Sequence, residues 1–354
     1  IWTRSAQLYM ESFLLARHGR QDQPLKPLLV RTLAEQQAEL PDWRLDHLVM
    51  LSDSTGVFQH ATYTIPNFEE GYCTDDNARA LLLTALLGEL GQSGPRLQRL
   101  ATTTAAFLQA AFDRERGRFR NFMSFDRRWL EDVGSEDCHG RAVWALGACV
   151  GRSPRPDLPP WAAAHFELAL TAVSEMTSPR AWAFTLMGIH EYFRRFSGDR
   201  LAGQVRDELT ARLIGLYDQV ATPDWPWFEE ILSYDNARLA HALIASGRDG
   251  GNPRALDIGL ETLSWLVQVQ RAPQGHFRAS GCHGFYRKGQ EPARFDQQPI
   301  EANATVAACL EAYRATNKPR WLNEARSAFE WFLGRNDLGL ELYDPRTGGC
   351  CDGL

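Results

Sequence analysis

Helical periodicity is the property of this sequence that most restricts its fold. From residue 75 to residue 334, apolar side chains recur at three- and four-residue spacing, and the alternation typical of half-buried strands is almost absent. Breaks such as Gly91 and Gly94-Pro95 divide the pattern into helices of ordinary length. The predicted helices form five successive pairs, at 75–90 with 96–112, 137–150 with 160–175, 180–196 with 199–220, 235–246 with 253–270, and 300–315 with 319–334.

The two helices of each pair differ in composition. The first helix is rich in small residues such as Ala142 and Ala145, and the second carries more charge, as at Arg206 and Glu208. Small residues suit tightly packed inner helices, whereas mixed faces suit an outer layer in contact with water. Each pair is therefore predicted to contribute one inner and one outer helix.

The N-terminal segments 4–17 and 27–39 also have helical spacing and are available for a sixth pair. Six such pairs predict an all-α fold, the (α/α)6 toroid, occupying residues 1–354 as a single domain; residues 1–20 are alternatively the end of an upstream module. The links that precede inner helices are longer than those within pairs, at 113–136, 221–234 and 271–299. Because binding groups collect in long loops on one face of a regular scaffold, these loops are predicted to form a cleft.

Charge and composition exclude several classes of partner. The formal net charge of -6 and a pI near 5.9 argue against nucleic acid or an anionic membrane. No apolar run is long enough to span a membrane, and no signal peptide is visible. Seven Cys without a CxxC pair indicate reduced thiols and a cytoplasmic setting, although a chain that begins at Ile1 leaves a lost signal open. Without HxxE or HExxH spacing, no metal and no cofactor are expected.

A repeated tetrapeptide opens two of the inner helices. Asp-Asn-Ala-Arg occurs at 76–79 and again at 235–238, and two further inner helices begin with Asp137 and Glu301. Acids at helix starts can simply cap the helix and favour its dipole. In a toroid, however, the starts of the inner helices converge at one end, so these acids would share a cleft. Crowded, desolvated carboxyls have separated pKa values, as glycoside hydrolysis requires.

The loops add groups that suit a sugar. Trp225, Trp227 and Phe228 stand beside Glu229 and Glu230, and aromatic rings can stack on the apolar faces of pyranose rings. Amide, acid and His side chains in the other loops would hydrogen-bond to hydroxyls. The predicted binding residues are Tyr72, Asp75, Asn77, Arg79, His139, Arg141, Trp225, Trp227, Glu229, Tyr234, Asp235, Asn236, His283, Gln298 and Glu301.

Three acids are predicted to be catalytic. Glu230 is the expected general acid, because the neighbouring aromatic rings would desolvate it and raise its pKa. Asp76 or Asp137 is the expected base, kept ionised by a nearby Arg and a helix N-terminus. The leading prediction is inverting cleavage of a glycosidic bond in an oligo- or polysaccharide, by hydrolysis or phosphorolysis.

Three motifs carry a family resemblance. Phe58-Gln59-His60, the run from Gly71 to Leu81 and the run from Gly348 to Leu354 resemble the six-hairpin glycosidase-like, or (α/α)6 toroid, superfamily. More narrowly, they are similar to a bacterial family of toroid domains, many of them fused behind a retaining-type glycosyltransferase module. The opening stretch from Ile1 to Phe13 resembles the last helix of such a module.

This resemblance implies a role in oligosaccharide or polysaccharide metabolism and a fused or associated glycosyltransferase as a partner. It assigns no catalytic residue. Two other functions therefore stay open: a non-catalytic carbohydrate-binding domain that serves the transferase, and a sugar epimerase with paired His as acid and base. Only His139 and His283 occupy the positions that an epimerase would need.

Overall fold

The computed structural model describes residues 43–354, so the helices predicted at 4–17 and 27–39 lie outside the described residues. The chain divides into two compact units, and their described parts are essentially Leu45–Ala211 and Arg212–Leu354. We call these unit 1 and unit 2. The boundary falls within one helix, α9 (Arg200–Val220). That residues 1–354 form one domain stays a prediction, and each unit is described by itself.

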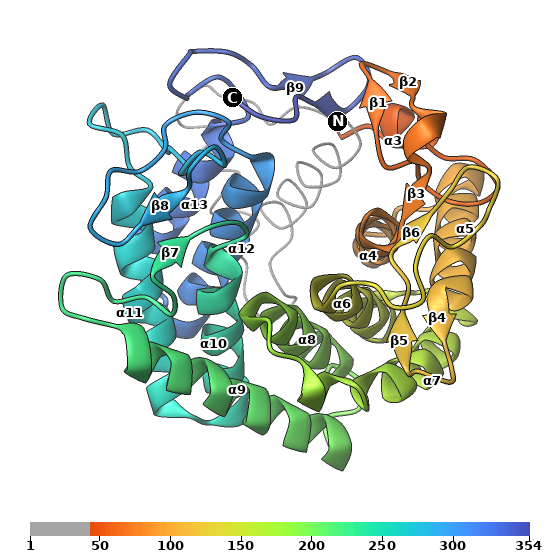
Figure 1. Cartoon of the computed structure of the whole chain (residues 1–354), viewed down its shortest axis with the longest axis horizontal. Helices are drawn as coiled ribbons and strands as arrows, with labels where there is room; N and C mark the ends of the chain where they lie inside the picture. Colours follow the sequence, from red (N-terminus) through yellow and green to blue (C-terminus); the bar gives the residue numbers. More distant parts are fainter. Residues whose placement is uncertain (1–42) are drawn as a thin grey trace. The chain divides into compact units, whose positions relative to one another are not determined.

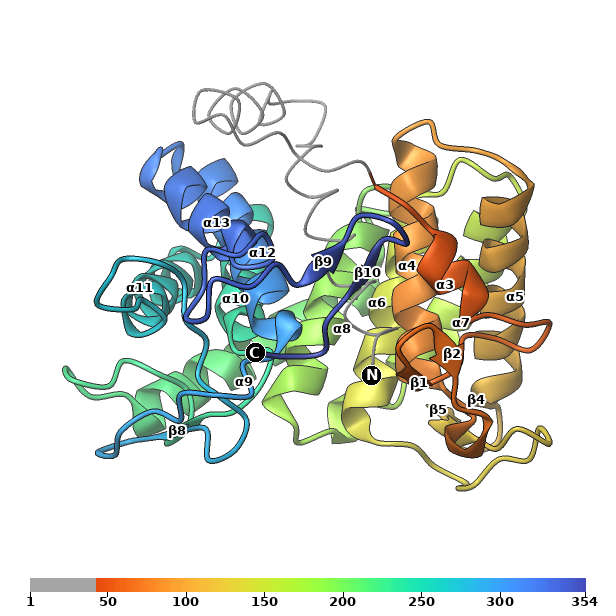
Figure 2. The same cartoon turned by 90° about the horizontal axis from the view of Figure 1, so that it is seen from above.

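Unit 1 is built from helices joined by very short strands (Figure 1). Its helices are α3 (Asp46–Met50), α4 (Thr74–Glu89), α5 (Pro95–Ala111), α6 (Glu136–Arg152), α7 (Leu158–Leu170), α8 (Pro179–Tyr192) and the first part of α9, with 3-10 turns at Phe68–Glu70 and Val173–Glu175. Its antiparallel strand pairs are β1 (Ala61–Thr62) with β2 (Ile65–Pro66), β3 (Tyr72–Cys73) with β6 (Phe122–Met123), and β4 (Phe112–Asp113) with β5 (Arg118–Phe119). Figure 2 shows β1, β2, β4 and β5 together at one end of the helices of this unit.

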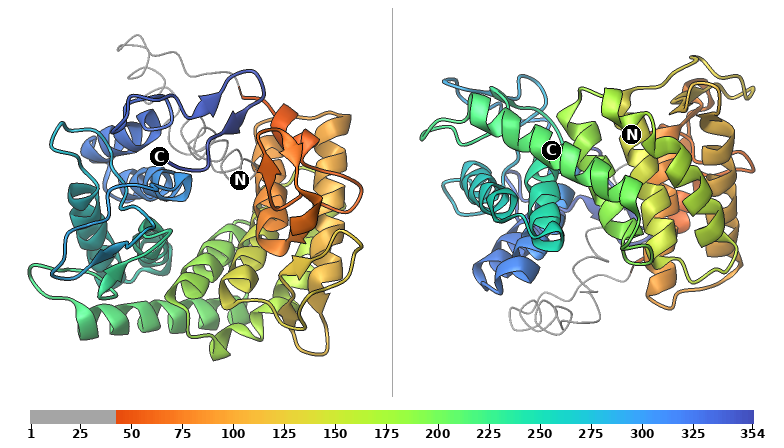
Figure 3. Two further views of the ribbon diagram at one scale, coloured as in Figure 1. Left: turned by 45° about the horizontal axis from the view of Figure 1, so that its top comes forward. Right: turned by 90° about the horizontal axis from the view of Figure 1, so that it is seen from below.

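Unit 2 repeats this plan with four helices (Figure 3). They are α10 (Ala237–Gly250), α11 (Pro253–Val269), α12 (Pro299–Thr316) and α13 (Arg320–Glu330). Two antiparallel strand pairs hold its loops, β7 (Ile231–Leu232) with β8 (Tyr286–Arg287) and β9 (Tyr343–Asp344) with β10 (Gly349–Cys350). Helix α10 packs against both α11 and α12, and α12 packs against α13.

Burial separates the helices into the two predicted kinds. In the inner helices α4, α6, α8, α10 and α12, nearly every central residue is buried. In the outer helices α5, α7, α11 and α13, burial follows one face, as at Leu97, Leu100, Ala101 and Thr104 of α5. The helices that are rich in small residues are therefore the tightly packed inner helices, as the sequence pattern predicted.

Where α6 meets α8, the two backbones touch. A β-carbon added to Gly147 would lie 2.1 Å from the carbonyl oxygen of Gly188, and one added to Gly140 would lie 2.7 Å from that of Ala181. No larger side chain fits between helices at this separation. The glycines of α6 and α8 therefore set the distance between two inner helices of unit 1.

The predicted helix pairs are present with shifted ends. Helix α10 begins at Ala237 rather than at Asp235, because Asp235 has a φ of 50°, in the left-handed region outside the helix. The stretch predicted as one helix at 160–175 is α7 followed by a 3-10 turn at Val173–Glu175. The short strands of the loops were not predicted, since two residues carry no detectable alternation. No helix among residues 43–354 is long and apolar enough to cross a membrane.

The contact between α6 and α8 gives a stability prediction. We expect Gly147→Ala to lower the free energy of unfolding by about 3 kcal/mol, because the new methyl group must push two backbones apart. Gly203→Ala is the matched control, since a β-carbon on Gly203 of α9 meets nothing within 4 Å, and it should be neutral or stabilising by up to about 1 kcal/mol. Urea unfolding of the three proteins measures the difference. Equal midpoints for the two variants would show that the helices are not in contact here.

Candidate functional site

Acidic residues in the first turn of α4 form the hydrogen bonds at the start of this helix. The thiol of Cys73, the N-cap residue, accepts from the backbone N–H of Asp76 at 3.4 Å and donates to Asp76 Oδ2 at 3.2 Å, in the manner of a capping box. Asp76 Oδ1 accepts from Arg79 Nη1 at 2.9 Å. Asp76 is therefore buried with both oxygens engaged within its own helix, which favours Asp137 as the predicted base.

Asp75 connects α4 to the neighbouring inner helix α6. Its carboxylate lies 3.6 Å from Arg79 Nη2 and 3.6 Å from Arg141 Nε. The guanidinium of Arg141 also lies over the ring of Phe184 in α8, 3.9 Å from the ring centroid. Three of the predicted binding residues, Asp75, Arg79 and Arg141, are thus brought together as a charged cluster at the helix starts.

Asp137 lies at the start of α6 and faces the start of α8. Ser178 Oγ donates to Asp137 Oδ1 at 2.6 Å, and the backbone N–H groups of Thr177 and Ser178 donate to Glu136 at 2.7 and 2.6 Å. The Asp137 carboxylate is only half-buried, unlike that of Asp76. It therefore remains the more accessible of the two predicted bases.

Three predicted binding residues of unit 1 are structural instead. Asn77 is fully buried; its amide accepts from Val57 N at 3.0 Å and donates to Cys73 O at 2.9 Å. Tyr72 is buried, with its ring stacked on Phe58 and its hydroxyl donating to Asp53 at 2.7 Å. These side chains fix the loop before α4, so they have a packing role, and that they bind sugar hydroxyls stays a prediction.

His139 is the third of these residues. Its side chain is fully buried, Nε2 lies 2.9 Å from the carbonyl oxygen of Ala169, and Nδ1 accepts from Phe119 N at 3.4 Å. Burial lowers the pKa of His139 to about 3, so the ring is neutral and, with Nδ1 accepting, is a donor at Nε2. It is a core histidine between α6 and α7, and its role as the acid or base of an epimerase stays a prediction.

The aromatic residues before α10 are also core residues. Trp225, Trp227 and Phe228 are buried, and Trp225 Nε1 donates to the carbonyl oxygen of Glu229 at 2.7 Å. Trp225 packs edge-on against Trp265 of α11 and against Tyr286 of β8. The apolar core of unit 2 therefore gives these tryptophans a packing role, and that they stack on sugar stays a prediction. Tyr234, by contrast, is exposed, and Glu229 is half-buried.

The side chain of Glu230 is exposed, which contradicts the reason for naming it the general acid. Its aromatic neighbours turn into the core, and its own carbonyl oxygen accepts from Lys288 N at 2.9 Å. The desolvation expected at Glu230 occurs instead at Glu301, which the sequence placed among the hydroxyl-binding residues.

Glu301 is a buried carboxyl in the first turn of α12. Its Oε2 accepts from Asn236 Nδ2 at 2.9 Å and from Gln270 Nε2 at 3.4 Å, and its Oε1 has no hydrogen-bond partner among residues 43–354. Burial, aided by the negative charge of Asp235, raises the pKa of Glu301 to about 7 against the hydrogen bonds from Asn236. Glu301 is therefore poised to hold or release a proton near neutral pH.

The second tetrapeptide repeat surrounds this carboxyl. Asp235 is fully buried and lies 3.3 Å from Arg238 Nε, the same pairing that Asp76 and Arg79 make in unit 1. Arg238 also donates to Asn303 of α12. The second repeat thus connects α10 to α12 through hydrogen bonds. The side chain of Asn236 donates to the carboxyl of Glu301, whereas the side chain of Asn77 hydrogen-bonds to backbone groups of Val57 and Cys73.

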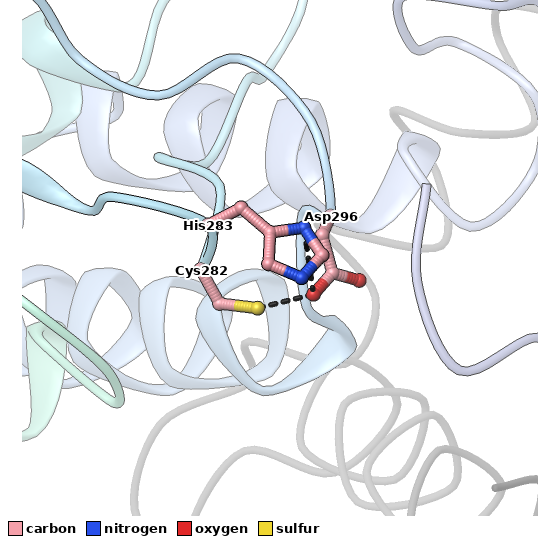
Figure 4. Close-up of side chains that lie close together, drawn as sticks. All are labelled: Cys282, His283 and Asp296. Carbon is pink, nitrogen blue, oxygen red and sulfur yellow. Dashed lines mark hydrogen bonds and ion pairs between the residues drawn. The ribbon is translucent and has the colours of Figure 1, made fainter.

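A second group of polar side chains lies in the long loop before α12 (Figure 4). The thiol of Cys282 donates to Asp296 Oδ2, and His283 Nδ1 lies 4.0 Å from the same oxygen. Gln298 Nε2 donates to Asp296 Oδ1 at 2.9 Å. The sequence predicted His283 and Gln298 as site residues but missed Cys282 and Asp296, although a Cys next to a His in a long loop is a recognisable signal.

Solved structures with the same architecture define the fold class. The chain is similar to a sugar epimerase from a ruminal bacterium, with 15% identity, a TM-score of 0.69, and coverage of 91% of this chain and 90% of that one. It is also similar to the cellobiose 2-epimerase of Spirochaeta thermophila, with 18% identity, a TM-score of 0.69, and coverage of 94% and 90%. A third likeness, at 11% identity, a TM-score of 0.52 and coverage of 91% and 87%, is to the GH76 alpha-mannanase BT2949 of Bacteroides thetaiotaomicron.

The fold is an (α/α)6 toroid. The fold class predicted from the sequence is thereby confirmed. No family model and no curated protein sequence matches the chain, and identities this low establish the fold alone. What this toroid does must be argued from its own side chains.

The buried Glu301 predicts an unusual dependence of stability on pH. Below about pH 4.5, the carboxyl is protonated in both folded and unfolded chains and has no effect. Between pH 4.5 and 7 the unfolded chain releases the proton while the folded chain keeps it, so stability falls as pH rises, by on the order of 3 kcal/mol. Glu301→Gln removes this pH-dependent contribution. The unfolding free energy of the wild type minus that of the variant should therefore decline from pH 4.5 to 7.

Urea unfolding at closely spaced pH values measures this difference. Glu291→Gln, an exposed residue of the preceding loop, is the control and should follow the wild type at every pH. A constant difference between wild type and Glu301→Gln from pH 4.5 to 8 would mean that Glu301 is ionised in the folded protein.

Proposed function

We propose that this toroid is a carbohydrate-active enzyme that cleaves a glycosidic bond, with Glu301 as the general acid. One observation carries the proposal: a buried carboxyl whose pKa is raised to about 7 and whose Oε1 has no partner among the described residues. A protonated carboxyl oxygen needs an acceptor, and a glycosidic oxygen would supply one. Asn236 holds the other oxygen and so fixes the direction of the proton.

The charged cluster at the starts of α4 and α6 supports a sugar as the substrate. Asp75, Arg79 and Arg141 combine carboxylate and guanidinium groups that can hydrogen-bond to vicinal hydroxyls. The similar solved structures are named for sugar epimerases and a mannanase, so proteins of this fold act on carbohydrates. A sugar is therefore the substrate class that the helix-start residues fit.

Inverting cleavage also needs a base that activates water. The base must be ionised when Glu301 is protonated, which favours a carboxylate in contact with solvent over one that is buried. Asp137 is half-buried and Glu230 is exposed, whereas Asp76 is buried and paired with Arg79. We therefore propose Glu230, an exposed carboxylate of the same unit as Glu301, as the base and no longer as the acid, while the role of Asp137 in unit 1 stays a prediction.

Sugar epimerisation is the second candidate. The specific observation in its favour is that the two epimerase structures match with TM-scores of 0.69, against 0.52 for the mannanase. A carboxyl with a pKa near 7 can also move a proton to and from carbon. His139, one of the two histidines expected for this chemistry, is however committed to the core. The carboxylates at the helix starts therefore favour cleavage.

The proposal predicts a pH profile for the reaction. Incubation with an oligosaccharide array, with products followed by NMR, should give a shortened sugar whose anomeric configuration is inverted. Because the acid must be protonated, kcat/KM should fall as pH rises above about 7. Glu301→Gln should lower kcat by about 10²- to 10⁴-fold and remove this fall, and Glu230→Gln should lower kcat without removing it.

Glu291→Gln, which is exposed in the loop before α12, is the control and should leave kcat unchanged. An epimerised product of unchanged length would instead support the second candidate. Saturable sugar binding without turnover would support a non-catalytic binding domain serving a transferase. Full activity in both Glu301→Gln and Glu230→Gln would remove the proposed mechanism.

A further inference from the structure

Cys282, His283 and Asp296 form a compact group of metal-binding side chains in unit 2. One ligand atom from each residue lies within 4.8 Å of the other two, and all three come from the loop between α11 and α12. Figure 4 shows the thiol and the imidazole directed toward the carboxylate. A single cation placed among these atoms would contact all three.

Backbone hydrogen bonds hold the segment that carries Cys282 beside the segment that carries Asp296. Gly281 N donates to Ala293 O at 2.7 Å, and Cys282 N donates to Asp296 O at 3.0 Å. Gly281 has no room for a side chain, because a β-carbon there would lie 1.7 Å from the carbonyl oxygen of Phe295. Asp296 itself has a φ of 60°, a conformation that is uncommon outside glycine. Cys282 and Asp296 are thus brought together by fixed backbone, so the cluster is not a chance contact of mobile side chains.

The neighbours of Asp296 resemble the outer partners of a metal ligand. Gln298 Nε2 donates to Asp296 Oδ1 at 2.9 Å, which orients the carboxylate and directs Oδ2 at the thiol and the imidazole. The C-terminal residues lie beside this loop, since Gln297 and Leu354 exchange two backbone hydrogen bonds of 3.0 Å. Asp352, in the same C-terminal segment, is a further carboxylate within electrostatic reach of the Cys282 thiol.

We propose that Cys282, His283 and Asp296 bind a divalent transition-metal ion, with zinc as the best match. A thiolate, an imidazole and a carboxylate together are the ligand types that zinc prefers, and they are unlike the all-oxygen sites of calcium and magnesium. Binding replaces the thiol proton of Cys282, which leaves to solvent, by a metal–sulfur bond. Three protein ligands leave a fourth position for water or for a further side chain.

The inference is independent of the proposed function and concerns binding alone. It also revises the expectation that no metal is bound, which rested on the absence of HxxE and HExxH. Those motifs report ligands on one helix, whereas here His283 and Asp296 approach through the fold of a long loop. The adjacent Cys282 and His283 are visible in the sequence, but their approach to Asp296 is not.

Metal titration of the full chain tests the proposal. The protein is stripped with a chelator and titrated with Zn²⁺ against a chromophoric competitor, and with Co²⁺ to follow the thiolate-to-metal absorption band. We expect one ion per chain and a Co²⁺ spectrum with a thiolate band. Cys282→Ala and Asp296→Asn should each weaken Zn²⁺ binding by at least about 10-fold, and Cys282→Ala should abolish the band.

Two further variants keep the test decisive if a loop variant folds poorly. His283→Ala removes a side chain that is 86% exposed, so it should preserve the fold and still weaken Zn²⁺ binding at least about 10-fold. Cys309→Ala, which removes a buried thiol of α12 outside the group, should bind Zn²⁺ like the wild type. Absence of a Co²⁺–thiolate band in the wild type, or equal Zn²⁺ affinity in His283→Ala, Cys282→Ala and wild type, would overturn the proposal.

Discussion

Contact between the backbones of two inner helices, α6 and α8, is the constraint around which unit 1 is packed. At the crossing of α6 and α8, Gly147 and Gly188 leave no space for side chains between the helices. Helices packed this closely have no solvated face, and α8 is buried continuously from Arg180 to Tyr192. A charged side chain on such a helix must find its partner inside the protein, because an isolated buried charge is very unfavourable.

Charge pairing satisfies this requirement almost throughout the inner helices, and Glu301 is the instructive exception. Arg79 pairs with Asp76 and Arg238 pairs with Asp235, in both cases three residues along the chain. Within residues 43–354, Glu301 receives amide donors, from Asn236 and Gln270, has the carboxylate of Asp235 nearby, and forms no ion pair with Lys or Arg. Burial therefore raises the pKa of this carboxyl to about 7. The property that suits an acid catalyst thus follows from burial without a counter-charge in the described part of the chain.

The sequence predicts the fold far better than it predicts the site, for a physical reason. Helical periodicity and small residues report how a segment packs over several turns, so the helix pairs and their inner and outer kinds were predictable. Exposure of a single loop residue depends on contacts that are distant in sequence. Trp225 and Glu230 look alike as candidates in the sequence, yet Trp225 packs on Trp265 of α11 while Glu230 faces solvent. His139 and Asn77 likewise found partners, at Ala169 and Val57, that no local pattern indicates.

The fold does not decide between bond cleavage and epimerisation, because similar toroids are named for both. The difference between the two reactions lies in where the proton goes: to a leaving-group oxygen in cleavage, or between carbon and the catalytic group in epimerisation. Cleavage requires an acid that is protonated at the working pH together with a separate ionised base. Burial raises the pKa of Glu301 to about 7, which meets the first requirement, and Glu230 of the same unit is an exposed carboxylate that we propose for the second. An epimerase needs two groups that exchange one proton at similar pKa values, whereas burial lowers the pKa of His139, one of the two histidines considered for that task, to about 3. The proposal of cleavage therefore rests on the environments of the carboxyls and not on the similarity of the fold.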